Sequence, residues 1–466
     1  MILRSTVRDA AHPTTTDIDA EVNEILSAGR LTLLGLQHLL TFYATAVVLP
    51  VIIATGIGLS SEDTIVFIGA TVLVGGIATI VQSAGVWKIG IRKPLVLGGS
   101  AVVIGPTIAI GTTGGGGTTG LLAVFGAAIV AGLVLMALAP LYGKMLRIFP
   151  PVVTGSVIAM VGLSLLPITI RLMGGGDPGA ETFGSATNMA IAGATILTIL
   201  LIYRFGKGLL KSMVILVGLL VGGFVGVLLG AVDFSSVAEA SWFGVTLPFH
   251  FGWPTFNLSA ILAMTVAVIV IGVECVSSYF AIGEVLGRPP TDKEVRGGIL
   301  AEGLASVLGG VFNSVPPTTF NGNIGLVRAS NVKSRWVVAV AGGLMIIASF
   351  FPKIGALAAV LPAPAVGAAL LALFGIITAL GIQILSRVDL TKDRNMIVVA
   401  ISIGVGFIPA VPGFFDLLPE ALRLVFDSGV VITAIVAVVL NLVFNGVGRP
   451  AQDADQVQVD EPNRME

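Results

Sequence analysis

The chain has 466 residues and a mean hydropathy of +1.01, with 55% of its residues hydrophobic. Only 11% of the residues are charged, against about 25% in soluble globular chains, so an ordinary water-soluble enzyme and a disordered protein are excluded. The formal net charge of −1 offers no basic field for a nucleic acid. The 60 glycines and 23 prolines fit membrane helices that approach one another closely or break at a cavity.

In chain order, residues 1–30 are polar and include no secretory hydrophobic region, which predicts a cytoplasmic tail and no signal peptide. Apolar runs then alternate with short polar or glycine-rich joints, and a polar tail follows at 447–466. The fourteen predicted spans are 31–54, 62–82, 95–110, 120–142, 150–170, 187–203, 212–232, 257–282, 297–311, 317–328, 334–351, 362–386, 395–409 and 428–446.

The distribution of Lys and Arg supports this count. Of 25 such residues, seventeen lie in joints after even-numbered runs and three in joints after odd-numbered runs. Basic residues gather on the cytoplasmic side of membrane proteins. Both termini are therefore predicted to be cytoplasmic, and the short runs 95–110 and 317–328 are needed as crossings.

An internal repeat is present. FPPVVTGSVIAMVG (149–162) resembles LPAPAVGAALLALF (361–374), and GIATIV (76–81) resembles GLASVL (303–308). Each pair is seven runs apart, and because seven is odd the two halves must have opposite orientation in the membrane. An inverted repeat of this kind is typical of secondary transporters, which bind substrate near the bilayer midplane.

The two short runs are equivalent in this repeat, and both are broken by proline and glycine. KPLVLGGSAVVIGPT (93–107) and PPTTFNGNIGLVRAS (316–330) therefore predict extended backbone at membrane depth. Free N–H and C=O groups there are tolerated only against protein or a wet cavity. A planar polar substrate could pair with them, next to the positive ends of two half-helices.

Ionisable residues inside apolar runs are functional candidates. Glu274 lies in the middle of the eighth run, and Ser278 follows one helical turn later, on the same face. Glu302, in the ninth run, is a candidate for proton coupling or for structural support of the tenth segment. Glu284 lies four residues before Arg288, which predicts an interfacial ion pair.

Polar residues of the first and tenth runs extend this candidate site. Gln37 and His38 lie inside run 1, and LQHLLTFYA (36–44) aligns with VECVSSYFA (273–281), so His38 matches Glu274 and could face the same centre. A neutral histidine with one structural hydrogen bond is the alternative. Asn321 and Asn323 offer amides that suit a base edge, and Phe320 could stack on a ring or serve packing.

Other chemistry is not indicated. The single Cys275 excludes a disulfide framework and a thiolate metal site. GTTGGGG (111–117) lacks the Gly-Lys-Ser/Thr of a phosphate loop. No metal-ligand cluster, catalytic triad or cofactor motif is found, so we expect neither a metal, a cofactor nor an enzyme.

GLQHLLTFYATAVVLP and RGGILAEGLASVLGGVFNSVPPTTFNGNIGLVRAS resemble the nucleobase–ascorbate transporter family, also called nucleobase:cation symporter 2. The resemblance covers about 31–446. It implies an all-α polytopic membrane protein with fourteen segments in a 7+7 inverted repeat, with short β-strands in segments 3 and 10. It also implies uptake of uracil, xanthine or uric acid, usually with protons, and a homodimer.

The family's two-part architecture carries over by position. A core of segments 1–4 and 8–11 would comprise 31–143 and 257–352, and a gate of segments 5–7 and 12–14 would comprise 150–232 and 362–446. The substrate would lie between segments 3 and 10.

Site residues also carry over by position. Glu274 matches the family's substrate carboxylate, Ser278 the polar residue one turn later, and Glu302 the acid of segment 9. The tenth-segment motif is matched by Phe320, Asn321, Asn323 and Gly325.

Two departures affect the predicted substrate. Gly322 stands where the motif has Gln, Glu or Pro, so the second clamp on a base is missing unless Asn321 or water replaces it. Ala101 stands where an aromatic is frequent. Ser330 and Asn331 also differ from the family's usual residues.

We therefore expect an inner-membrane nucleobase:proton symporter that works by alternating access. The small Ala101 and Gly322 favour an oxopurine such as xanthine or uric acid, with uracil as the next candidate. A sodium-coupled nucleobase transporter and an anion exchanger of the same architecture are the alternatives. Glu274 argues against the exchanger because a carboxylate repels anions, and polar residues clustered at one depth argue against a channel.

Overall fold

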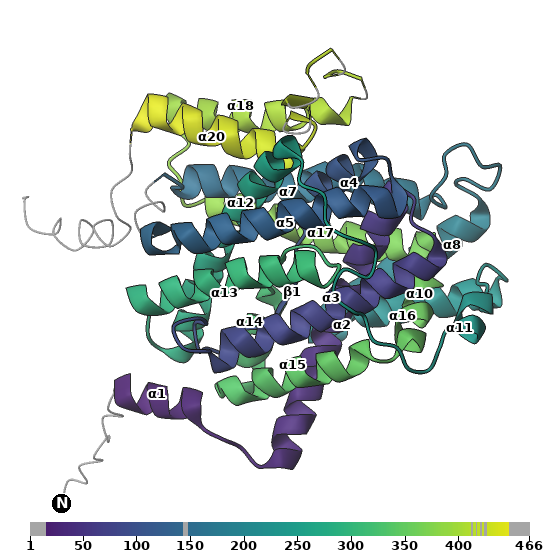
Figure 1. Cartoon of the computed structure of the whole chain (residues 1–466), viewed down its shortest axis with the longest axis horizontal. Helices are drawn as coiled ribbons and strands as arrows, with labels where there is room; N and C mark the ends of the chain where they lie inside the picture. The colour runs from purple at the N-terminus through teal and green to yellow at the C-terminus, as the bar shows by residue number, and fades with distance from the viewer. Residues whose placement is uncertain are drawn as a thin grey trace, which may run out of the picture.

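The computed structural model describes residues 15–142, 148–411, 413–415, 417–419, 422–423 and 426–446. The predicted C-terminal tail at 447–466 and residues 1–14 of the predicted N-terminal tail lie outside the described residues. Within the described residues, the chain is an assembly of packed helices (Figure 1).

The first half contains α1 (Thr15–Asn23), α2 (Ala28–Ile57), α3 (Ser61–Ala84), β1 (Leu97–Gly99), α4 (Ile104–Thr113), α5 (Gly117–Leu138), η1 (Ala139–Leu141), α7 (Pro151–Met173), α8 (Ala186–Phe205), α9 (Gly208–Ser212), α10 (Val214–Leu228) and α11 (Ser235–Glu239). The second half contains α12 (Leu258–Leu286), α13 (Asp292–Val311), β2 (Pro317–Thr319), α14 (Asn321–Ser330), α15 (Arg335–Ser349), α16 (Pro352–Ala359), α17 (Ala363–Leu385), α18 (Asp393–Gly406), η2 (Ile408–Ala410) and α20 (Gly429–Asn445).

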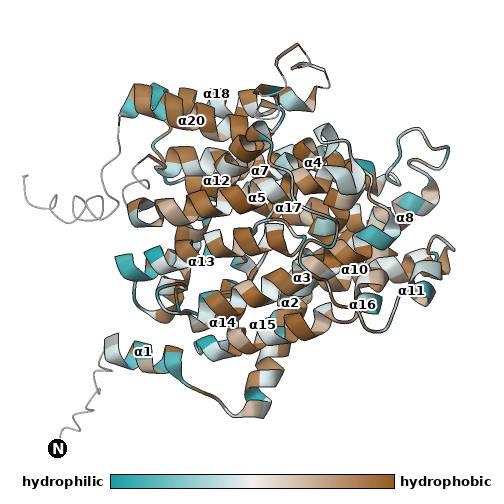
Figure 2. Cartoon of the chain, viewed as in Figure 1, coloured by the Kyte–Doolittle hydropathy of each residue, from teal (hydrophilic) through white to brown (hydrophobic). Residues whose placement is uncertain are grey.

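Many of these helices suit a bilayer. By length and composition, eight described helices could cross a membrane, or nine if α15 and α16, which meet at a bend of 84°, form one span. Hydrophobic residues make up much of the helices (Figure 2), and many large ones remain exposed, among them Leu200, Phe224 and Val443. An apolar exterior on apolar helices is that of a multi-pass membrane protein. The count of fourteen segments remains a prediction.

Two helix pairs approach through glycines. A Cβ on Gly76 of α3 would lie 2.6 Å from the Gly342 carbonyl oxygen of α15. A Cβ on Gly132 of α5 would likewise lie 2.6 Å from the Gly303 carbonyl oxygen of α13. Neither space admits a side chain, so backbone packs directly on backbone, as in membrane helix interfaces rich in small residues.

The pair α7 and α17 packs in the same way. A Cβ on Gly162 would lie 2.4 Å from the Phe374 carbonyl oxygen, and one on Gly381 would lie 2.2 Å from the Ala159 amide nitrogen. These are the helices whose sequences resemble each other at 149–162 and 361–374.

The two strands form a small antiparallel sheet. Leu97 pairs with Thr319 and Gly99 with Pro317. β1 lies in the predicted third segment and β2 in the predicted tenth, 218 to 222 residues apart across these pairs. A Cβ on Gly98 would lie 1.7 Å from the Phe42 ring of α2, so only glycine fits beneath that ring.

Candidate functional site

Two helix N-termini meet the sheet. α4 begins at Ile104, shortly after β1, and α14 begins at Asn321, two residues after the end of β2. The first N–H groups of a helix have no partner within it, and the helix dipole makes this end positive. The strands therefore bring two sets of polar backbone groups to one place.

Glu274 faces the start of α14. Its carboxylate Oε1 accepts a hydrogen bond from Asn321 Nδ2 at 3.5 Å. Ser278 Oγ lies 2.5 Å from Asn321 Oδ1 and 3.1 Å from the Glu274 carbonyl oxygen, to which it donates. Glu274 is partly exposed, and within the described residues no hydrogen bond reaches its Oε2. A carboxylate oxygen is thus free to accept a bond from a ligand beside Asn321.

The space around these groups is shaped by Phe320, Gly322 and Ala101. The Phe320 ring meets Phe42 edge to face, with centroids 5.6 Å apart. A Cβ on Gly322 would lie 2.6 Å from the Phe320 ring, so the missing motif side chain and the position of this ring are linked. Gly322 is exposed, and Ala101 is half-buried in the turn between β1 and α4.

Glu302 is completely buried. Its Oε1 accepts hydrogen bonds from Thr319 Oγ1 at 2.6 Å, Gln82 Nε2 at 3.1 Å and Tyr279 Oη at 3.1 Å. Its Oε2 has no partner among the described residues. Sequence reasoning missed the three donors, although Gln82 and Tyr279 are polar residues inside apolar runs and gave the same kind of signal as Glu302.

His38 lies beside Asn323. His38 Nδ1 is hydrogen bonded to Asn323 Oδ1, and Asn323 Nδ2 donates to the Pro94 carbonyl oxygen at 2.9 Å. The pair thus connects α2, the strand-bearing segment before β1 and α14. Gln37 contributes its carbonyl oxygen, which accepts a bond from Thr41 at 2.8 Å. The expected ion pair between Glu284 and Arg288 is wrong, because Arg288 binds Asp19 and Glu294.

A cavity of about 590 Å³ lies elsewhere. It is bounded by α2, α3, α11 and α16, and by the segment that follows α11. Its lining includes Tyr43, Glu62, Glu239 and His250 and none of the site residues above. The groups that the sequence indicated are therefore not the lining of this cavity.

Comparison with known proteins identifies the family of the chain. A family model described as a permease family matches residues 29–412. The chain belongs to this family, the nucleobase–ascorbate transporters. It is thus a transport protein and not an enzyme.

Two relatives are similar over nearly their whole length. The chain is 39% identical to the xanthine permease of Bacillus subtilis, over 90% of this chain and 94% of the relative. It is also 39% identical to the uric acid transporter UacT of Escherichia coli, over 91% of this chain and 88% of the relative.

Among solved structures, the chain resembles the transmembrane domain of BicA, a cyanobacterial bicarbonate transporter. The TM-score is 0.57 over 91% of this chain and 99% of that domain, with 14% sequence identity. At this identity the likeness shows a shared fold alone. It does not favour the anion exchanger over the nucleobase permeases at 39% identity.

Proposed function

We propose that this permease takes up a nucleobase, and that its substrate is an oxopurine such as xanthine or uric acid, with uracil as the next candidate. The observation that carries the proposal is the partly exposed Glu274 carboxylate, which faces Asn321 at the start of α14. A carboxylate accepts hydrogen bonds and an amide both donates and accepts, which complements the N–H and C=O edge of an oxopurine.

Substrate would bind with its ring N–H groups toward Glu274 and its carbonyl groups toward backbone N–H at the starts of α4 and α14. Phe320, held against Phe42, would cover one face of the ring. Gly322 and Ala101 leave room for the second ring of a purine. Ser278, bonded to Asn321, would fix that amide's orientation.

Transport would follow alternating access, with a core of 31–143 and 257–352 moving against a gate of 150–232 and 362–446. The packing supports an inverted repeat. An offset of seven segments converts the pair of segments 2 and 11 (α3 and α15) into the pair 9 and 4 (α13 and α5), and both are joined through glycines. The same offset converts the pair of segments 5 and 12 (α7 and α17) into itself.

We propose proton coupling through Glu274 or Glu302, with sodium as the alternative ion, in a homodimer of the cell's inner membrane with both termini cytoplasmic. Glu302 suits coupling because one carboxylate oxygen holds β2 through Thr319 while the other is unpartnered among the described residues. Protonation of Glu302 would weaken its hydrogen bond with Thr319 of β2, the strand beside the proposed substrate.

The test is uptake of labelled xanthine, uric acid and uracil into membrane vesicles, with a proton gradient, a sodium gradient or neither. We expect accumulation of an oxopurine under the proton gradient. Glu274→Gln should abolish uptake while the purified protein keeps its size-exclusion profile. Glu284→Gln, at an exposed position of the same helix, is the matched control and should leave uptake unchanged.

Normal uptake by the Glu274→Gln variant would overturn the site. Accumulation driven by a sodium gradient without a pH gradient would show that the coupling ion is sodium and not the proton.

A further inference from the structure

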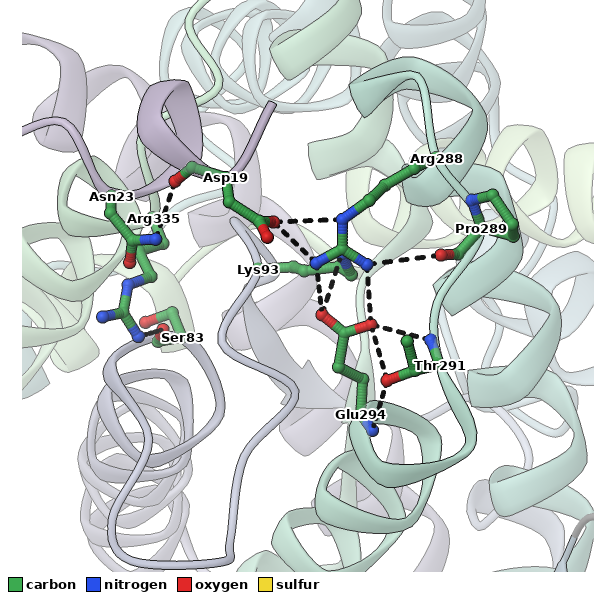
Figure 3. A network of polar contacts seen from close by, with 9 residues as sticks. All are labelled: Asp19, Asn23, Ser83, Lys93, Arg288, Pro289, Thr291, Glu294 and Arg335. Carbon is green, nitrogen blue, oxygen red and sulfur yellow. Dashed lines mark hydrogen bonds and ion pairs between the residues drawn. The ribbon is translucent and has the colours of Figure 1, made fainter. Parts of the chain in front are cut away.

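Four charged side chains form a cluster at the end of the molecule where the joints are rich in Lys and Arg (Figure 3). Arg288, which follows α12, donates to Asp19 of α1 at 2.7 Å and to Glu294 of α13 at 2.8 Å. Lys93, which precedes β1, lies 3.3 Å from the same Glu294 oxygen. We define these four residues as the Lys93 cluster; its formal charges sum to zero.

Lys93 is the most deeply buried member. Its side chain is 1% exposed, and its ion pair is with Glu294, whose side chain is 22% exposed. A buried ammonium is costly unless it is paired. The position of Lys93 is therefore set by Glu294, which is itself fixed by two bonds from Arg288 and by Thr291 at the start of α13.

The cluster is joined directly to the candidate substrate site. The residue after Lys93 is Pro94, whose carbonyl oxygen accepts the bond from Asn323 of α14. Two residues further, the Val96 carbonyl oxygen accepts a bond from the Phe320 amide at 2.9 Å. An anchor on Lys93 thus fixes the strand-bearing segment one residue before its first contact with the tenth-segment motif.

Helix α1 completes the charge balance. Without Asp19, two cations would share the single carboxylate of Glu294. α1 is held on the same end of the molecule by Lys333 against Glu21 at 2.8 Å and by Ser334, which donates to the Glu24 carbonyl oxygen at 2.6 Å. Arg288, Lys333 and Ser334 all lie in the predicted core. α1 would therefore be attached to the core and would not restrain the gate.

We infer that Lys93 is a positioning residue for the substrate site, anchored by Glu294 and neutralised through Arg288 by Asp19 of α1. The inference rests on the proposed function in one respect, namely that substrate binds beside β1 and β2. Lys93 would act through Pro94 and the strand, and would not touch the substrate.

The experiment compares Lys93→Met, Glu294→Gln and the double variant. Glutamine keeps an acceptor for the Thr291 cap, so α13 should still begin correctly. We expect each single change to raise the KM for the oxopurine that the wild type transports by about 3- to 30-fold, with Vmax per folded transporter little changed. The double variant should be no worse than the more affected single variant, because the two residues act as one pair.

A second measurement is independent of the substrate. Hydrogen exchange of the amides of residues 95–99 in purified protein should accelerate in both single variants. Lys392→Met is the control, because Lys392 forms an exposed pair with Asp389 in another joint of the same end. It should change neither KM nor exchange.

Each outcome is assigned to one claim. If the wild type takes up no nucleobase, the proposed function fails, while exchange at 95–99 still tests the anchor. If the wild type transports but Lys93→Met leaves KM and exchange unchanged, the anchor is overturned. If Lys93→Met does not fold, Asp19→Asn at the exposed end of the cluster takes its place, and an unchanged KM and exchange there overturn the inference.

Discussion

Glu274 and Glu302 are both acids within apolar segments, but they make different contacts. Glu274 has one long bond from Asn321 and is partly open, whereas Glu302 is fully buried and accepts three bonds through one oxygen. At the scale of single residues, this difference separates Glu274, the proposed substrate carboxylate, from Glu302, whose contacts are all internal. Glu302 binds β2 through Thr319. A change in the protonation of Glu302 would therefore affect the strand that lies beside Glu274.

The Thr319 bond can be tested by Thr319→Val, which removes the hydroxyl at similar volume. Loss of a buried hydrogen bond to a carboxylate lowers the free energy of unfolding by about 1–3 kcal/mol. We therefore expect a lower thermal denaturation midpoint in detergent and weaker uptake. Thr55→Val is the control because the Thr55 hydroxyl is exposed and bonds within its own helix at 2.8 Å. An unchanged midpoint for Thr319→Val would show that this bond does not hold the strand.

At the scale of elements, β1 depends on close approach to α2. The absence of a side chain at Gly98 lets the Phe42 ring lie directly on the strand, and the same ring meets Phe320 at the end of β2. One aromatic side chain therefore sets the position of both broken segments.

Gly98→Ala should abolish uptake, since its Cβ would lie 1.7 Å from the Phe42 ring and no real contact is that short. Adding Phe42→Ala should restore part of the folded protein. The measurements are labelled-substrate uptake and the yield of monodisperse protein. Gly343→Ala in α15, where nothing lies within 4 Å of the new Cβ, should behave as wild type. Wild-type uptake by Gly98→Ala would contradict the geometry.

Helix α1 is attached through Arg288 to Glu294, a carboxyl whose pKa is lowered. Glu294 lies in the first turn of α13, before the apolar run. Burial raises the pKa of this carboxyl, but the bonds from Arg288 and the Thr291 amide, together with the charge of Lys93, lower its pKa from 4.5 to about 2. Because the pKa of Glu294 is lower in the folded protein, its ionised carboxylate stabilises the fold above pH 4.5. This stabilisation is lost as the pH falls toward 2.

Hydrogen exchange of α1, corrected for the intrinsic effect of pH, should therefore be unchanged between pH 8 and 5.5 and should increase below 4.5. Arg288, Lys93 and, through Arg288, Asp19 are the charged groups around Glu294. Release of α1 near pH 6 would contradict this expectation. A change of transport rate between pH 8 and 5.5 would have to come from groups other than Glu294.

At the scale of the whole molecule, the predicted core and gate touch where α4 meets the start of α20. A Cβ on Gly105 would lie 3.7 Å from Ser428 Oγ. If the two parts move against each other during transport, a covalent bond here should stop the cycle.

We expect oxidation of the paired variant Gly105→Cys and Ser428→Cys to block uptake, and reduction to restore it. The two single variants are the controls, because they show the effect of each substitution without a bond. Cross-linked protein that still transports at the wild-type rate would exclude relative movement at this contact.

The sequence predicted much of the fold because hydrophobicity and small residues are local signals. The apolar runs are helical in the structure, and the runs interrupted by proline and glycine contain β1 and β2. The neighbourhood of Glu274, Ser278 and Asn321 followed from resemblance to a family. The helix α1 was missed within the predicted tail, since it is only nine residues long and mostly polar, and it is held by distant partners.

Side-chain pairing was less predictable. His38, which aligns with Glu274 in the repeat, is bonded to Asn323, a partner that was not predicted. Arg288 binds Asp19 and Glu294 instead of its near neighbour Glu284. Gln82 and Tyr279 reach Glu302 from 220 and 23 residues away. Such partners depend on how helices are oriented in the finished packing, which residue spacing does not encode.

The contact between Asp19 and Arg288 spans 269 residues, and this has a consequence for biogenesis. At synthesis rates of about 5–20 residues per second, roughly 15–50 s would pass between synthesis of the N-terminal helix and synthesis of Arg288. A bulky fusion partner placed ahead of this helix would compete for that late docking, so tags for expression belong at the other terminus.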